Sequence, residues 1–206
     1  MSLKGINLTY ILICALILSC SNNETFESEQ ELWGFIKDPA NEYTQNKSIN
    51  NVDFQLLYKP TDLLVQQELG DKVSDSLIGK LRNKYNKQLY FSLSMSSNNK
   101  ELLSSLPKNR AEFGIMVNDL AFGMKEKVYL INQQKDTIMM LDYVYPRMYG
   151  MSKSTNILFV FNKNEDKIKS EYLNFTLSNM NIETGDVKFK IPTKIIENQP
   201  KLSFKN

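Results

Sequence analysis

Residues 89–95 constrain the fold more than any other stretch of this 206-residue chain, because their side chains alternate strictly between apolar and more polar. The apolar set is Leu89, Phe91, Leu93 and Met95, with Tyr90, Ser92 and Ser94 between them. Successive side chains of a β-strand point to opposite faces, so one face suits a core and the other suits water. Strands that are wet on one side are typical of antiparallel sheets. The segment therefore predicts a strand of an antiparallel sheet.

Further strands follow from the same alternation or from short apolar runs. They are predicted at residues 52–59, 128–132, 137–145, 156–161, 172–177 and 187–191. Residues 133–136 form the expected loop of a hairpin, and residues 183–186 form an expected turn. Connections in the second half are too short for the crossovers that parallel strands need. Residues 41–51 are rich in Asn, Ser, Thr and Gln, which predicts a loop.

Helical spacing of apolar residues is found mainly in the first half of the chain. The predicted helical segments are residues 28–36, 61–85, 100–106 and 110–124. Thr61 or Asp62 is expected to cap the second of these. Gly70 and Gly79 disfavour one continuous helix there, so we expect two short helices or one bent helix. The sum predicts an α+β domain, mainly antiparallel β and sandwich-like, with two or three helices inserted in the first half.

The last predicted helix carries an apolar stripe with i, i+3, i+4 spacing. Its members are Phe113, Met116, Val117, Leu120, Ala121 and Met124. We interpret the stripe as a face packed on the core. An adaptable, Met-rich binding groove is the alternative.

The N-terminus has the layout of a secretory signal. Lys4 stands in a short region without acids, an apolar run extends from Tyr10 to Leu18, and the small residue Ser19 and then Cys20 follow. The run is about half of the roughly 20 apolar residues that span a bilayer. A permanent transmembrane helix is therefore not expected.

The residues Ile17, Leu18, Ser19 and Cys20 resemble the lipobox of bacterial lipoproteins. This resemblance implies cleavage before Cys20, lipidation of its thiol and acylation of the new amino group. Several acyl chains hold a protein stably at a membrane, whereas one chain does so only marginally. The residue after the cysteine is Ser21 rather than Asp, and in this the chain resembles lipoproteins of the outer membrane. A plain cleaved signal with an incidental Cys20 is the alternative.

The expected organisation follows from this signal. It comprises a signal peptide at 1–19, the lipidated Cys20 with a polar, acidic tether at 20–31, and a single β-rich globular domain at 32–206. Trp33 and Phe35 are expected to pin the tether to the domain. An exposed aromatic contact is the alternative for these two residues.

Cysteine and histidine usage excludes several kinds of chemistry. The chain has two cysteines, of which Cys14 would leave with the signal, and it has no histidine. Ser-His-Asp and Cys-His catalysis and histidine-ligated zinc or haem are therefore excluded, and we expect no cofactor. A net charge of +2 does not indicate a nucleic-acid partner. Carboxylate chemistry, a Ser-Lys pair such as Ser152 with Lys153, and oxygen ligands for a metal remain, but no motif supports a metal site.

The segment 142–150 is the one constellation that suggests a binding patch, and its candidate residues are Tyr143, Tyr145, Arg147 and Tyr149. Tyr and Arg dominate the energy of many binding surfaces. Alternation would place Asp142 on a largely apolar face with Met140 and Val144. An acid there needs a partner, and Arg147 is the expected one. A structural turn held by this pair is the alternative to a binding patch.

Two hypotheses about function remain. The first is a membrane-anchored envelope lipoprotein that acts as a non-catalytic binding or assembly module for a protein or a surface glycan. The alternative is a carboxylate-dependent, glycan-type hydrolase of the envelope, which needs two acids at roughly 5–10 Å across a cleft.

Overall fold

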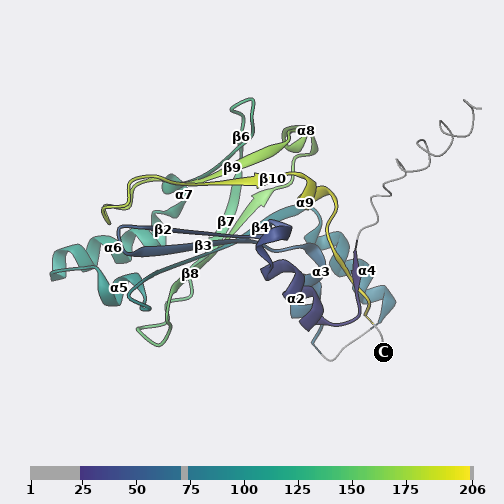
Figure 1. The fold of residues 1–206 in the computed structure, drawn as a ribbon, viewed down its shortest axis with the longest axis horizontal. Coiled ribbons are helices and arrows are strands. Elements are labelled where there is room, and N and C mark those ends of the chain that lie inside the picture. The colour runs from purple at the N-terminus through teal and green to yellow at the C-terminus, as the bar shows by residue number, and fades with distance from the viewer. Residues whose placement is uncertain (1–23, 71–73, 205–206) are drawn as a thin grey trace, which may run out of the picture.

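The structure, a computed structural model, describes residues 24–70 and 74–204. The predicted signal peptide and Cys20 lie outside the described residues. Two antiparallel sheets pack face to face, with α5 and α6 at one end of the molecule and α2, α3 and α4 at the other (Figure 1). The predicted α+β, mainly antiparallel and sandwich-like fold is confirmed.

The first sheet has the strand order β2-β3-β4-β8-β7. Its strands are β2 Thr44–Ile49, β3 Val52–Tyr58, β4 Gln88–Ser97, β8 Thr155–Asn162 and β7 Met140–Val144. The predicted alternation of β4 is confirmed, since its apolar set is buried while Ser92, Ser94 and Ser96 are half-buried. Tyr90 is buried as well, because the ring of Tyr85 lies against it with 5.6 Å between ring centroids.

The second sheet has the order β10-β9-β5-β6. Its strands are β10 Val187–Pro192, β9 Tyr172–Leu177, β5 Val128–Ile131 and β6 Thr137–Ile138. The hairpin of β5 and β6 is confirmed by pairing of Ile131 with Thr137. The strand predicted at 137–145 is divided, because the chain leaves the second sheet at Met139 and enters the first as β7. This crossing closes one side of the sandwich.

Helices occur along the whole chain, so the expectation that they are confined to the first half is wrong. They are α2 Glu29–Lys37, the 3-10 turn η1 Pro39–Asn41, α3 Thr61–Leu69, α4 Asp75–Tyr85, α5 Leu102–Ser105, α6 Arg110–Phe122, α7 Met124–Lys127, α8 Glu165–Ile168 and α9 Lys194–Glu197. The late helices α8 and α9 are single turns, too short to show a helical period in sequence. Two separate helices in the region 61–85 are confirmed.

Two local predictions are wrong for identifiable reasons. Residues 41–51 are not all loop, because β2 pairs along its length with β3. As an edge strand with little buried surface, β2 needs few apolar residues. The side chains of Thr61 and Asp62 do not cap α3, whose N-cap is Pro60. Asp62 instead accepts hydrogen bonds from Arg82.

The pair of Asp62 and Arg82 joins α3 to α4 and also holds β11, near the last described residue, against them. Asp62 accepts from Nε and a terminal nitrogen of Arg82, at 2.8 and 2.6 Å, and from the backbone N of Leu202 at 2.8 Å. Leu202 belongs to β11 Lys201–Leu202, which pairs in parallel with β1 Thr25–Phe26. The ring of Phe35 lies 5.0 Å from that of Phe26, so the segment expected as tether contacts the domain from Phe26 onward.

The core between the sheets is built on aromatic rings. Phe175 of the second sheet lies with its ring centroid 5.7 Å from both Phe91 and Phe159 of the first sheet. The Phe161 and Phe189 rings lie 6.2 and 6.4 Å from it. Tilted and edge-to-face geometries at such distances are the favourable ones for aromatic pairs. All five rings are fully buried.

Within residues 24–70 and 74–204, no helix combines the length and the apolar character that crossing a bilayer requires.

Replacing Phe175 with Ala is expected to lower the free energy of unfolding by about 3–5 kcal/mol, because it opens a cavity where the two sheets meet. The same change at Phe122, which is 76% exposed, is the matched control and should stay within about 0.5 kcal/mol of the wild type. Urea unfolding followed by circular dichroism measures both. Equal effects at the two positions would contradict the role given to Phe175.

Candidate functional site

Within the described residues, the large apolar side chains that stay exposed fall in one stretch, between residues 113 and 151. They are Phe113, Ile115, Phe122, Tyr129, Met139, Val144, Met148, Tyr149 and Met151. Six of them belong to α6 or to the loop that joins β7 to β8, and we call these six the distal surface: Phe113, Ile115, Phe122, Met148, Tyr149 and Met151. Its helix, α6, lies at the end of the molecule opposite to α2 and α4 (Figure 1).

The helix α6 is apolar on two sides. Met116 and Leu120 are buried, as the predicted stripe requires, but Phe113 of the same stripe is 38% exposed. On the solvent side, Ile115 and Phe122 are 59% and 76% exposed. A helix that is apolar all round is normally buried on all sides. Ile115 and Phe122 lie outside the predicted stripe and were not predicted to be functional, although their i, i+7 spacing was a usable signal.

Of the predicted patch, the structure brings Arg147 and Tyr149 together at the surface. The Arg147 guanidinium lies 4.8 Å from the centroid of the Tyr149 ring and 5.9 Å from that of Phe113. This stacking places the loop beside α6. Tyr149 is 74% exposed, so the cluster presents an aromatic ring and a cation to solvent.

Tyr143 and Tyr145 are not part of that exposed cluster. Both are half-buried against the core, and the Tyr143 ring stacks on Phe159 with 6.2 Å between centroids. Burial raises the pKa of both hydroxyls, and for Tyr145 the charge of Glu101 raises it further. These two tyrosines therefore contribute to sheet packing.

The predicted pairing of Asp142 with Arg147 is wrong. The register of β7 against β8 shifts between Met140 and Asp142, which resets the alternation of the strand. Met140 packs on the core and Asp142 is exposed, where it accepts a hydrogen bond from the backbone N of Tyr143 at 2.8 Å. With water around it, the carboxylate has no need of a buried partner.

A buried carboxylate, Glu101, fixes the loop that carries Arg147 and Tyr149. Its two oxygens accept hydrogen bonds from the backbone N of Gly150 at 3.1 Å and of Ser152 at 3.0 Å. Beside it, the backbone N of Leu102 donates to the Thr155 hydroxyl at 3.0 Å. Charge-assisted bonds of this kind are stronger than neutral ones. The loop is thereby held to the start of α5.

A groove borders the distal surface where α5 and α6 meet the loop between β9 and β10. Ile115, Leu106 and Ile182 line it, and its volume is about 640 Å³. The side-chain amide of Asn50 donates to the backbone carbonyl of Glu183 at 2.5 Å, which ties the β2–β3 turn to its rim. The groove extends the apolar area beside Ile115.

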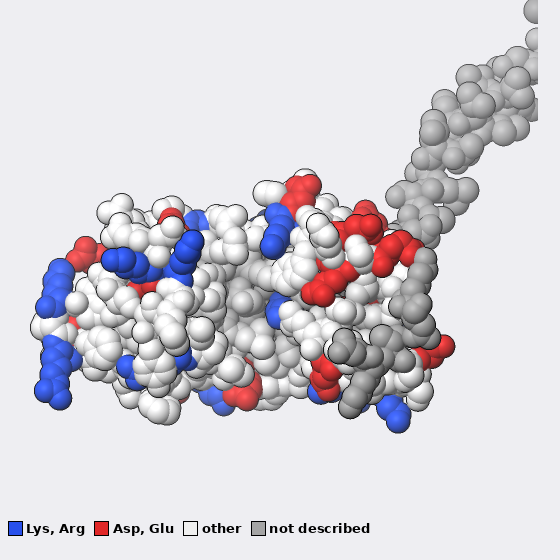
Figure 2. All heavy atoms as spheres, turned by 90° about the horizontal axis from the view of Figure 1, so that it is seen from below, with Lys and Arg blue, Asp and Glu red and all other residues white. Residues whose placement is uncertain are grey.

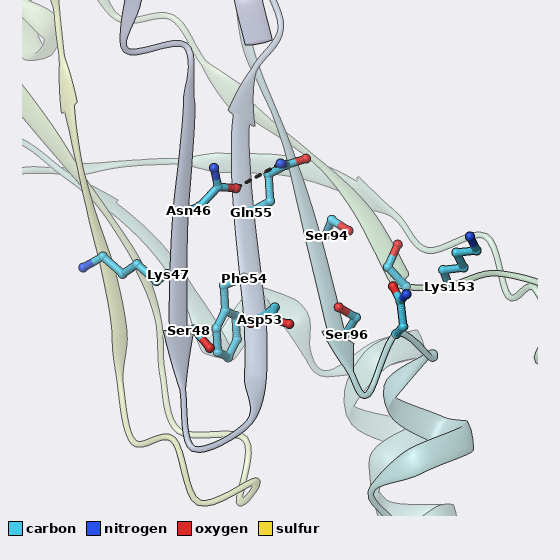
Figure 3. Close-up of a pocket in the computed structure, with 11 residues that line it drawn as sticks. Asn46, Lys47, Ser48, Asp53, Phe54, Gln55, Ser94, Ser96 and Lys153 are labelled. Atoms are coloured by element: carbon cyan, nitrogen blue, oxygen red, sulfur yellow. Dashed lines mark hydrogen bonds between the residues drawn. The ribbon is translucent and has the colours of Figure 1, made fainter. Parts of the chain in front are cut away.

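A second, polar pocket of about 470 Å³ lies on the outer face of the first sheet (Figure 3). Register places Asn46, Gln55 and Ser94 in one row across three strands, and Ser48, Asp53 and Ser96 in the next row. The Gln55 amide donates to Asn46 at 2.9 Å. Lys153 and Ser154, from the loop held by Glu101, form one wall. Figure 3 shows Lys47 pointing away from these side chains.

Among the described residues, no group of three or more acidic, histidine or cysteine side chains is arranged to hold a metal. Asn164 and Asp166, whose side chains carry oxygen atoms that could bind a metal, have other roles. Asn164 caps α8 through its side-chain oxygen, and Asp166 pairs with Lys169 at 3.0 Å.

The pair of Ser152 and Lys153, which the sequence left open as a catalytic pair, makes no contact with the described residues that supports catalysis. The Ser152 hydroxyl accepts from the backbone N of Ser154 at 3.3 Å, which is a turn interaction.

Comparison with known proteins gives little. No protein-family model and no curated protein matches the chain. A crystal structure of a novel protein of unknown function from Burkholderia pseudomallei is similar with a TM-score of 0.40 and 11% identity, over 81% of this chain and 86% of that chain. A similarity this distant supports no conclusion about function.

Replacing Glu101 with Gln is expected to lower the free energy of unfolding by about 1–3 kcal/mol, because an amide NH₂ would face a backbone N–H that needs an acceptor. Hydrogen exchange at Gly150 and Ser152 should accelerate more than exchange in the core. Glu126→Gln, at an exposed position, is the control for the loss of one charge. Unchanged exchange at Gly150 and Ser152 would show that Glu101 does not hold the loop.

Proposed function

We propose that this protein is a membrane-anchored, non-catalytic binding module of the bacterial envelope, which presents its distal surface to a protein partner. One observation carries the proposal. The large apolar side chains left exposed in the described residues lie between residues 113 and 151, and α6, which carries three of them, is at the end remote from the first described residues (Figure 1). Large apolar side chains that stay exposed at one end of a protein mark interaction sites.

The expected lipid anchor and the distal surface fit one geometry. Glu24 is four residues beyond Cys20 (24 − 20 = 4), and four extended residues reach at most roughly 14 Å. An anchor on Cys20 would therefore hold the end that contains β1 and α2 close to the lipid. The distal surface would then face away from the membrane, where a partner can reach it. The outer membrane is the proposed location, on the resemblance around Ser21.

The basic side chains near the distal surface favour a partner whose contact surface is apolar and bordered by acidic groups. Figure 2 shows acidic side chains gathered near the first described residues and Lys and Arg side chains at the opposite end. The loop between β7 and β8 has no acid, whereas it has Arg147 and Lys153. Arg147, whose guanidinium lies over the Tyr149 and Phe113 rings, is the type of residue that dominates binding energy.

The alternative of a carboxylate-dependent hydrolase needs two acids that are free to act across one cleft. The two acids that line the groove beside Ile115 are Glu112, which accepts from the backbone N of Lys108, and Glu183, which pairs with the Lys108 ammonium group. Such enzymes place two acids roughly 5–9.5 Å apart across a cleft. In the described part of the chain, the buried carboxylates are those of Asp62 and Glu101, and both accept structural hydrogen bonds. Of the acids there, Asp53 alone lines the polar pocket.

The anchor is tested by a Cys20→Ala variant, which is expected to move from the membrane fraction to the soluble fraction, because it lacks the thiol that carries lipid. Cys14→Ala, within the expected signal, is the matched control and should remain with the membrane. Metabolic labelling with a fatty acid should mark the control only. A Cys20→Ala protein that still fractionates with membranes would refute lipid anchoring.

The binding surface is tested by photocrosslinking in cells, with a photoreactive amino acid in place of Phe122 or Met151. Both positions are expected to give the same discrete protein adduct. The same probe at Lys80, exposed on α4 at the other end, is the control. Phe122→Asp should remove the adduct formed from position 151, because a charge in the apolar surface opposes burial. Equal adducts from Lys80, or an adduct insensitive to Phe122→Asp, would argue against this function.

A further inference from the structure

We propose that the polar pocket on the outer face of the first sheet is a second binding site, whose ligand is a neutral oligosaccharide. This goes beyond the binding of a protein at the distal surface, because the pocket has different residues and opposite chemistry. Its floor comes from β2, β3 and β4, and its wall from Lys153 and Ser154 (Figure 3). A volume of about 470 Å³ lies within the usual range of small-ligand sites.

The pocket holds side chains whose hydrogen-bonding capacity the protein does not use. In residues 24–70 and 74–204, the side chains of Asp53, Ser94 and Ser96 make no hydrogen bond or ion pair, and neither does Lys153. Hydroxyl groups and carboxylates supply acceptors, while hydroxyls and ammonium groups supply donors. Sugar hydroxyls both donate and accept, so this mixture of groups matches them.

The hollow exists because β4 carries serines on its outer face. Ser94 and Ser96 are short, and Ser94 pairs with the longer Gln55 of β3, which in turn pairs with Asn46 of β2. Strand surfaces favour β-branched and aromatic residues, so Val or Thr would suit the fold better than Ser at these positions. The serines therefore leave space at some cost in strand propensity. Binding of a ligand in that space would explain why serines are present there.

The wall of the pocket formed by Lys153 and Ser154 is also held in place before a ligand binds. Glu101 accepts from the backbone N of Ser152, the residue that precedes Lys153. The wall is thus fixed by a buried carboxylate before any ligand arrives. A site that is rigid before binding loses less conformational entropy when it binds.

The charge of the site indicates a neutral ligand. Asp53 contributes one negative charge and Lys153 one positive charge, and the other outer-face side chains of the pocket are amides and hydroxyls. Lys47 and Phe54 also line the pocket, but they occupy core-facing positions, and the Lys47 ammonium group lies 5.4 Å from the centroid of the Phe189 ring on the other face of the sheet. An anionic sugar would gain Lys153 but would meet the unpaired Asp53, so an uncharged one is favoured.

The test is saturation-transfer difference NMR on the full chain in a detergent without a sugar headgroup. The probes are maltotriose, mannotriose and triacetylchitotriose, with trigalacturonate as the charged comparison. At least one neutral trisaccharide is expected to receive saturation, and trigalacturonate is not. Ser94→Val and Ser96→Val fill the hollow with residues that strands favour, so they should keep or raise thermal stability. Each is expected to weaken binding at least about tenfold, through lost hydroxyl contacts and lost space.

Ser92→Val is the matched control, because Ser92 is on the same face of the same strand but does not line the pocket. It should bind as the wild type does, and so should Phe122→Asp, which separates this site from the distal surface. Saturation of no neutral probe, stronger saturation of trigalacturonate, or equal binding by Ser94→Val and Ser92→Val would each overturn the proposal. None of these results would bear on crosslinking from position 122.

Discussion

The structure depends on the contact of Phe175 with the aromatic rings of the opposite sheet. Apart from Cys20, the expected mature chain has no cysteine, so no disulfide can join the two sheets. Packing must therefore hold them, and Phe175 supplies it with Phe91, Phe159 and Phe161, whose ring centroids lie 5.7 to 6.2 Å from its own. Because this core lies between the sheets, the outer face of the first sheet and the outer side of α6 are left free for other roles.

The two ends of the sandwich differ in how far their apolar side chains are covered. At the end near the first described residues, Arg82 and Asp62 pair beneath β11, and Phe35 packs on Phe26, so apolar groups are covered. At the other end, α6 is left with Ile115 and Phe122 in water. A protein that were only a stable globule would gain solubility from polar residues there. The difference between the ends is the physical basis of the proposed orientation.

Much of the fold was predictable, because a two-residue period survives in strands that have one wet face, as in β4 and β10. Local periodicity failed where structure depends on a neighbour. The strand β2 owes its conformation to pairing with β3, and the bulge in β7 reversed the expected surroundings of Asp142. For the candidate site, residue type and position in the segment 142–150 were enough to select Arg147 and Tyr149, which the structure brings together. Glu101 could not be found, since its partners are 49 and 51 residues away in sequence.

The sequence by itself determined the class of fold and the absence of histidine, and it predicts a lipid anchor at Cys20 and therefore a mature domain without a free thiol. These depend on residue type and local spacing. Only the tertiary structure decided which apolar side chains stay exposed, that Arg147 stacks beside Phe113, and that serines of β4 form a hollow next to Lys153. These depend on segments far apart in the chain meeting in space, which no local pattern encodes.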